Sequence, residues 1–78
     1  MVVWHVCTVN KLKRYKLNGN RINPPVRAWE TIEQAERFSL STGRKVILRL
    51  KFPDGAPKLE GHFNQARVLD YQYQLNSI

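Results

Sequence analysis

The stretch from Lys45 to Phe52 constrains the fold more than any other part of the sequence, because its residues alternate strictly between two faces. One face carries Val46, Leu48, Leu50 and Phe52, and the other carries Lys45, Ile47, Arg49 and Lys51. Successive side chains of a β-strand point to opposite sides, so this period of two predicts a strand with one buried face. Such a face needs another element to cover it.

A helix that could cover this face is predicted from Thr31 to Thr42. Thr31 is a suitable N-cap, and Gln34, three residues later, completes a capping box. Gly43 can take the left-handed conformation that ends helices. We expect the helix to pack on the apolar residues Val46, Leu48 and Leu50 of the strand, or on the equivalent face of the sheet. The stripe that would make this contact consists of Ile32, Ala35 and Phe38.

The first part of the chain predicts two more strands and a hairpin. Met1–Val9 is dense in β-branched and aromatic residues, which favours a strand near the centre of a sheet. Lys11–Leu17 alternates and runs into Asn18-Gly19, a dipeptide that tolerates the positive φ angles of a tight hairpin turn. We therefore expect a second strand that returns over Asn20–Ile22, where the prolines that follow restrict the return to a sheet edge.

Phe63–Leu75 predicts a long final strand, with a β-bulge near Val68 and Leu69 where the apolar residues change parity. The expected fold class is therefore α+β, with a four- to five-stranded antiparallel sheet and one helix packed on one face. A chain of 78 residues is too short for a second core, so residues 1–78 are predicted to form one small domain. The uncovered sheet face is where we expect a binding surface.

Charge is distributed unevenly along the chain. Residues 1–27 contain six basic and no acidic residues, whereas the rest contains seven basic and six acidic residues. A block of one sign usually marks an interaction surface. We therefore predict a basic hairpin that binds nucleic acid, DNA or RNA, through phosphate contacts with low sequence specificity. The predicted contacts, with Tyr15 as a base-stacking residue, are Lys11, Lys13, Arg14, Tyr15, Lys16, Arg21, Arg27, Lys45, Arg49 and Lys51.

Two other interpretations explain the same charge. Lysines often protect exposed sheet edges, so the hairpin could be a solvated edge without a ligand. The protein could also be a small accessory or inhibitor protein, of the kind carried by phages and mobile elements, that docks its hairpin on an acidic protein surface. An interface of that kind needs a central apolar anchor, whereas nucleic acid needs exposed planar groups. Residues that could belong to the core or to a stacking surface are Trp4, Tyr71 and Tyr73.

The sequence contains no strong signature of catalysis or metal binding. His5 and Cys7 fall on one face of the first predicted strand, and Asp70 could orient the imidazole from another strand. Residues two apart on a strand are not in hydrogen-bond contact, and a cysteine among valines is usually a core residue. The closely spaced ligand pairs of zinc sites are missing. We therefore predict no enzyme activity, no metal site and no cofactor.

The surroundings of the protein follow from its cysteine content and its apolar runs. Cys7 is the only cysteine, so no internal disulfide can form and a cytoplasmic location is favoured. The longest apolar runs are far shorter than the roughly 20 residues that span a bilayer, so we expect no membrane partner. A small core and a long final strand with a free edge predict a homodimer.

Overall fold

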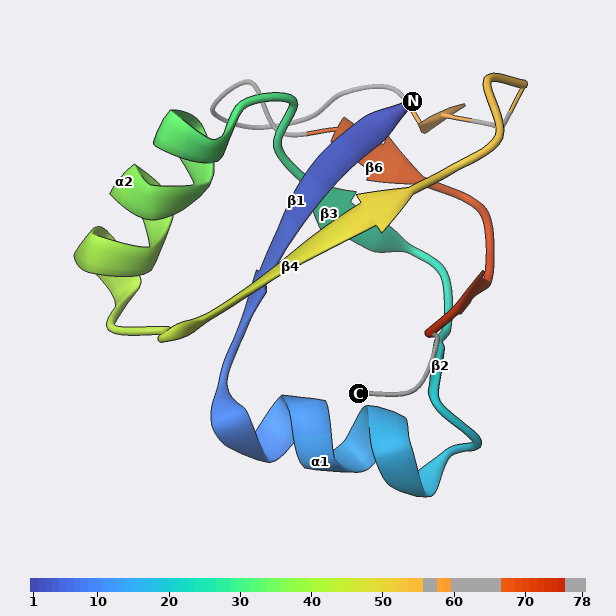
Figure 1. Ribbon diagram of the computed structural model, residues 1–78, viewed down its shortest axis with the longest axis horizontal. Coiled ribbons are helices and arrows are strands. Elements are labelled where there is room, and N and C mark those ends of the chain that lie inside the picture. The colour runs from blue at the N-terminus through green and yellow to red at the C-terminus, as the bar shows by residue number, and fades with distance from the viewer. Residues whose placement is uncertain (56–57, 60–66, 76–78) are drawn as a thin grey trace.

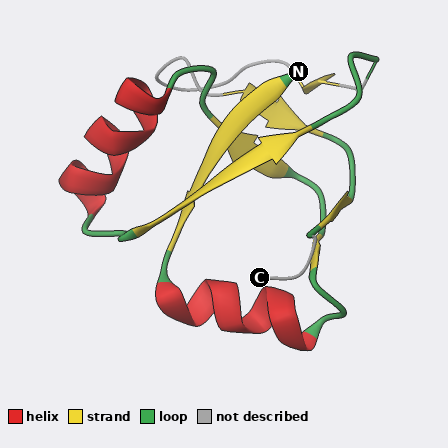
Figure 2. Cartoon of the chain, in the orientation of Figure 1, coloured by secondary structure: helices red, strands yellow, loops and turns green. Residues whose placement is uncertain are grey.

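The computed structural model describes residues 1–55, 58–59 and 67–75, and the side chains of all of these except residues 58, 59 and 67. This part of the chain is a small α+β domain with two helices and several antiparallel strands (Figures 1 and 2). Strands β1 (Val2–Cys7) and β4 (Val46–Lys51) form a ribbon. Helix α2 (Ile32–Thr42) lies along one side of this ribbon, and α1 (Val9–Leu17) crosses the end of β1.

The second helix and the strand after it confirm the sequence prediction closely. Thr31 is the N-cap of α2, and its hydroxyl oxygen accepts a hydrogen bond from the Gln34 N–H at 3.3 Å. Gly43 ends the helix in the left-handed conformation with φ 72°. The predicted strand over Lys45–Phe52 is β4, which pairs with β1 so that Cys7 lies opposite Val46.

The predicted hairpin strand over Lys11–Leu17 is wrong, because this segment belongs to helix α1. Thr8 is its N-cap, and the Thr8 hydroxyl oxygen accepts from the Lys11 N–H at 3.0 Å. Basic residues in the last turn, Arg14 and Lys16, interact favourably with the negative end of the helix dipole. The described part of the chain therefore has two helices where the sequence predicted one.

The Asn18-Gly19 turn serves the end of a helix rather than a hairpin. The Asn18 N–H donates to the carbonyl oxygen of Arg14 at 3.0 Å, which closes the last turn of α1. Gly19 (φ 70°) takes the positive φ angle expected of the dipeptide, but Asn18 does not (φ −92°). The second residue with a positive φ angle is Asn20 (φ 57°), which leads into β2 (Arg21–Ile22). A turn at this position was predicted correctly, but the helix before it was predicted as a strand.

In the described ranges, the strands form three small antiparallel sheets instead of one sheet of four or five strands. β1 pairs with β4, β2 pairs with β7 (Tyr73–Gln74), and β3 (Val26–Ala28) pairs with β6 (Arg67–Leu69). β6 also pairs with β5 (Lys58–Leu59). A bridge between Trp4 and Trp29 joins β1 to the chain just after β3, and backbone hydrogen bonds of 2.8 Å run in both directions between these two residues.

The predicted long final strand is two short strands, β6 and β7, separated by residues 70–72. β6 pairs with β3 in regular register through Val68 and Leu69, so the expected bulge is not found there. The first part of the predicted strand, residues 63–66, lies outside the described residues.

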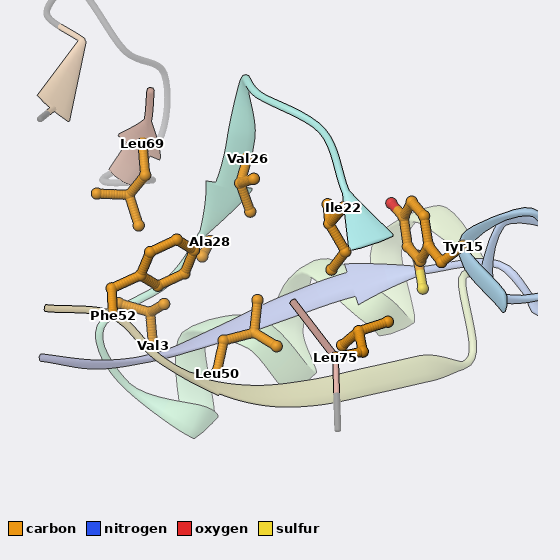
Figure 3. Close-up of a cluster of buried hydrophobic side chains, with 10 residues drawn as sticks. Val3, Tyr15, Ile22, Val26, Ala28, Leu50, Phe52, Leu69 and Leu75 are labelled. Carbon is orange, nitrogen blue, oxygen red and sulfur yellow. The ribbon is translucent and has the colours of Figure 1, made fainter. Parts of the chain in front are cut away.

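Two clusters of apolar side chains form the interior. The main core runs from Leu69 to Tyr15 across the strands (Figure 3). Its buried members are Val3, Cys7, Tyr15, Ile22, Val26, Ala28, Leu50, Phe52, Leu69 and Leu75. The small core has Val6, Trp29 and Ala35 as its buried members, with Trp4, Phe38 and Ile47 packed against them.

Helix α2 packs on the face of β4 opposite to the predicted one. Ala35 and Phe38 belong to the small core with Ile47, whereas Leu50 belongs to the main core. The main-core face of β4 is covered by side chains from other strands, such as Val26 and Leu69, which leaves the Ile47 face for the helix. Ile32, which was expected to pack, is 42% exposed. Among the residues that the structure describes, no helix has the length and apolar character needed to cross a membrane.

Candidate functional site

Two adjoining hollows lie where β1, α1 and β3 meet. The larger one, which we call the main hollow, has a volume of about 370 Å³, and the side hollow has about 260 Å³. His5, Lys11, Tyr15 and Pro25 line both of them. The main hollow is also lined by Val6, Cys7, Thr8, Arg27, Trp29, Phe38, Arg44 and Val68. The side hollow adds Arg14, Asn18, Arg21, Ile22 and Asn23.

Five basic residues from four segments meet at these hollows. The contributing segments are α1, β2, β3 and the short connection between α2 and β4. The residues that they contribute are Lys11, Arg14, Arg21, Arg27 and Arg44. Within the described part of the chain, neither lining includes an acidic residue, and the ion pair that the structure shows, between the N-terminus and Asp54, involves none of these cations. The hollows therefore concentrate positive charge that no described carboxylate neutralises.

The fold brings Arg44 to the site from a distant part of the sequence. Arg44 follows the C-cap of α2, and the Ser39 hydroxyl donates to its backbone carbonyl oxygen. Since Val46 pairs with Cys7, the start of β4 lies beside the end of β1, where α1 begins. The Arg44 guanidinium lies over the Phe38 ring, 5.4 Å from the ring centre. This contact helps to hold the guanidinium at the hollow.

A buried histidine and tyrosine form the polar inner wall of the hollows. His5 and Tyr15 are each 8% exposed. The His5 Nδ1 lies 2.6 Å from the carbonyl oxygen of Arg27, and its Nε2 lies 2.9 Å from the Tyr15 hydroxyl. A carbonyl oxygen only accepts, so Nδ1 carries the hydrogen and donates it. In the neutral imidazole, Nε2 then accepts from the Tyr15 hydroxyl.

The electrostatics of this wall agree with that assignment. Burial lowers the pKa of His5 below its ordinary value of 6.5, although the hydrogen bond to the Arg27 carbonyl opposes the shift. The nearby positive charges of Lys11 and Arg44 lower the His5 pKa further. Burial also raises the pKa of Tyr15 to about 12, with a smaller contribution from Cys7. The two rings are therefore uncharged at neutral pH, and the positive charge of the site comes from the lysine and the arginines.

The structure separates the predicted contact residues into two groups. Five of them line the hollows, namely Lys11, Arg14, Tyr15, Arg21 and Arg27. The other five are exposed and line neither hollow, namely Lys13 and Lys16 on α1 and Lys45, Arg49 and Lys51 in or beside β4. The basic β4 residues do not extend the patch in the way that the sequence suggested.

Of the four aromatic residues considered for base stacking, three pack in or against a core and Tyr71 is exposed. Tyr15 belongs to the main core, so its ring lacks an exposed face on which a base could stack. Trp4 packs against the small core and Tyr73 against the main core. Tyr71 is 38% exposed and meets Phe52 edge to face, with ring centres 5.7 Å apart.

Sequence reasoning gave no binding role to several lining residues, among them Arg44, Thr8 and His5. His5 was considered only as a partner of Cys7, with Asp70 to orient it. In the structure its partners are Tyr15 and the Arg27 backbone. The signal for α1 was present in Thr8, which precedes a run of good helix formers. The approach of Arg44 depends on the β1–β4 register, which only a correct pairing of the two strands would have suggested.

The described residues contain no group of three or more His, Cys, Asp or Glu side chains arranged to hold a metal ion. The chain was compared with models of known protein families, with curated proteins and with solved structures, and it matches none of them.

Proposed function

We propose that the protein is a non-enzymatic module that binds nucleic acid through phosphate contacts, with low sequence specificity. The contact surface is the pair of hollows and the adjacent face of α1, in place of a basic hairpin. The observation that carries this proposal is the meeting of five cationic residues from separate segments, without a described acidic residue in either lining. Phosphate groups neutralise such a cluster and release their counterions.

Low specificity follows from the chemistry of the lining. The residues with free charge are lysine and arginine, which contact phosphates of any sequence. Sequence readout requires side chains that enter a groove and meet base edges. α1 is only nine residues long and carries basic residues on its exposed surface. It is therefore better suited to contacts with the phosphate backbone of a nucleic acid than to the reading of base edges.

The first test is a salt titration of binding to short single-stranded and duplex oligonucleotides, measured by fluorescence anisotropy. Three to five phosphate contacts give a slope of log K against log salt of about −2 to −4. We expect a slope in this range and similar affinities for unrelated sequences. The absence of binding even at low salt would overturn the proposal. A nuclease-resistant acidic protein partner, captured from a lysate in that case, would favour the alternative of a protein-docking module.

A matched pair of double variants tests the location of the site. Lys11→Glu with Arg14→Glu reverses two residues that line the hollows. Lys13→Glu with Lys16→Glu reverses two residues on the same helix that line neither hollow. Both doubles change the net charge by the same amount, and each places one glutamate in the last turn of α1.

We expect the Lys11/Arg14 double to weaken binding by more than tenfold for every sequence and to reduce the salt slope by about 2. The Lys13/Lys16 double should weaken binding only slightly, through the loss of long-range attraction. Equal losses in the two doubles would show that charge is spread over the whole helix and that the hollows are not the site. Circular dichroism confirms that each variant keeps the fold.

A further inference from the structure

The main hollow combines two kinds of lining that a phosphate backbone alone would not need. Near Lys11, Arg27 and Arg44 it is cationic, and it also includes the apolar and aromatic residues Trp29 and Phe38. Trp29 and Phe38 pack with their ring centres 4.3 Å apart and belong to the small core. Trp29 is 4% exposed and Phe38 is half-buried, so a ligand meets only a small part of these two rings. A ligand that contacts both kinds of lining has an anionic group joined to an apolar body.

The size of the main hollow limits this ligand to one small unit. Its volume of about 370 Å³ lies at the lower end of the range for pockets that hold small molecules, roughly 300–1,000 Å³. A base pair within a duplex cannot enter a pocket of this size. A single nucleotide at the end of a strand, or a free nucleotide, can enter it.

The inner wall offers hydrogen bonds to an uncharged part of such a ligand. Because the Tyr15 hydroxyl donates to His5 Nε2, its oxygen keeps lone pairs that accept from a ligand hydroxyl or amino group. Thr8 lines the same hollow at the start of α1, and the first turn of α1 contains no acidic residue. The positive end of the helix dipole adds to the field of Lys11 and Arg44.

We propose that the main hollow is a pocket for one nucleotide that bears a terminal phosphate monoester, held by Lys11, Arg27 and Arg44. This proposal deepens the nucleic-acid function proposed above and rests on it for the source of the ligand. A monoester carries about one more negative charge than a phosphate inside a strand. A pocket with three cations and no described acidic residue therefore favours a phosphorylated end over the interior of a strand.

The test compares four probes: a single-stranded 12-mer with a 5′-phosphate, the same 12-mer with a 3′-phosphate, the same 12-mer without a terminal phosphate, and adenosine 5′-monophosphate. The protein contains two tryptophans, Trp4 and Trp29. In a Trp4→Phe background, Trp29 is the only one left, and its fluorescence reports directly on the main hollow. Anisotropy of labelled oligonucleotides measures total binding in parallel.

We expect at least one phosphorylated 12-mer to bind about tenfold more tightly than the unphosphorylated one and to change Trp29 fluorescence. Arg44→Gln should abolish this preference, because it removes a positive charge that lines the hollow. Arg44 is exposed, so the substitution should leave the fold intact. Lys45→Gln, at the next residue and outside the hollow, is the matched control and should keep the preference.

The outcomes test the nucleotide pocket and the binding of nucleic acid as separate proposals. Equal binding of all three 12-mers would overturn the pocket and leave phosphate-backbone binding intact. A preference for a phosphorylated end that survives Arg44→Gln would also overturn it, because the phosphate would then lie elsewhere. Binding of adenosine 5′-monophosphate at the Trp29 site without binding of any 12-mer would support the pocket with a free nucleotide as its ligand, and it would overturn the nucleic-acid function.

Discussion

At the scale of single residues, the buried pair of His5 and Tyr15 is the least ordinary feature of the molecule. Buried polar side chains are stable when their hydrogen bonds are made, and here each ring nitrogen of His5 has a partner. The arrangement holds only while the imidazole is neutral. With a proton on Nε2, the Tyr15 hydroxyl could no longer donate a hydrogen bond to that nitrogen. The protonated ring would also add a positive charge near Lys11 and Arg44.

His5 therefore makes the stability of the fold depend on pH. The folded pKa of His5 lies below its unfolded value of about 6.5, so the unfolded chain binds the proton first as the pH falls. The stabilisation is complete above pH 6.5 and is lost as the pH falls toward the folded pKa. We expect the free energy of unfolding, from urea titrations, to fall between pH 7.5 and 5.5 by at most about 1.4 kcal/mol per pH unit.

His5→Gln is the control for this prediction. Glutamine keeps a donor and an acceptor but does not titrate, so the variant should lose stability at pH 7.5 and lose much of its pH dependence. Asp54 does not disturb the comparison, because the N-terminal amine holds the pKa of its carboxyl below the ordinary value and its titration lies at lower pH. A wild-type slope that persists in His5→Gln would assign the titration to another group.

At the scale of elements, the contrast between α2 and α1 shows what sequence reasoning could and could not reach. α2 has an N-cap, an apolar stripe and a C-terminal glycine, and these three signals agree. In α1 only Leu12 and Tyr15 pack inward, whereas Leu17 is 88% exposed. In the sequence, Tyr15 and Leu17 fit a period of two, whereas Leu12 and Tyr15, three residues apart, fit a helix. The cap at Thr8 decides between them.

The wrong secondary structure of α1 also explains why only some of the residues of the candidate site were predicted. The charge count identified Lys11, Arg14, Arg21 and Arg27, because these residues are close together in the sequence and stay close in the fold. It also included Lys13 and Lys16, because a wrong secondary structure cannot say which side of the segment faces a hollow. Arg44 comes from a separate segment and was out of reach.

Removal of the cap should destabilise α1 measurably. Thr8→Ala leaves the Lys11 N–H without its side-chain acceptor, and the loss of an N-cap costs about 1 kcal/mol. For a domain of this size we expect the melting temperature to fall by roughly 4–8 °C. Thr31→Ala removes the equivalent cap of α2 and should have a similar effect. Thr8→Ser should restore most of the loss, and an unchanged melting temperature in Thr8→Ala would contradict the cap.

At the scale of the whole molecule, a chain of 78 residues has little core to spare. Such a domain buries only about 60% of the surface that its unfolded chain exposes, and its total stability is of the order of 5 kcal/mol. The residues of the apolar face of β4 were predicted correctly, but they are not equally buried in the core. Leu50 is 1% exposed in the main core, whereas Leu48 is only half-buried and packs at its edge.

This inequality gives a test of where the centre of the molecule lies. Leu50→Ala leaves a cavity among Val3, Val26 and their neighbours, which costs about 2–5 kcal/mol and can unfold the domain. Leu48→Ala removes the same atoms from the edge of the core, where solvent and neighbouring side chains fill part of the space, so it should cost clearly less. Urea titrations followed by circular dichroism measure both values. If Leu48→Ala lost more free energy of unfolding than Leu50→Ala, the centre of the core would lie at Leu48 and the assignment to Leu50 would be wrong. If the Leu50 variant is too unstable to measure, the milder Leu50→Val should still lose more stability than Leu48→Val, because the difference in burial is the same.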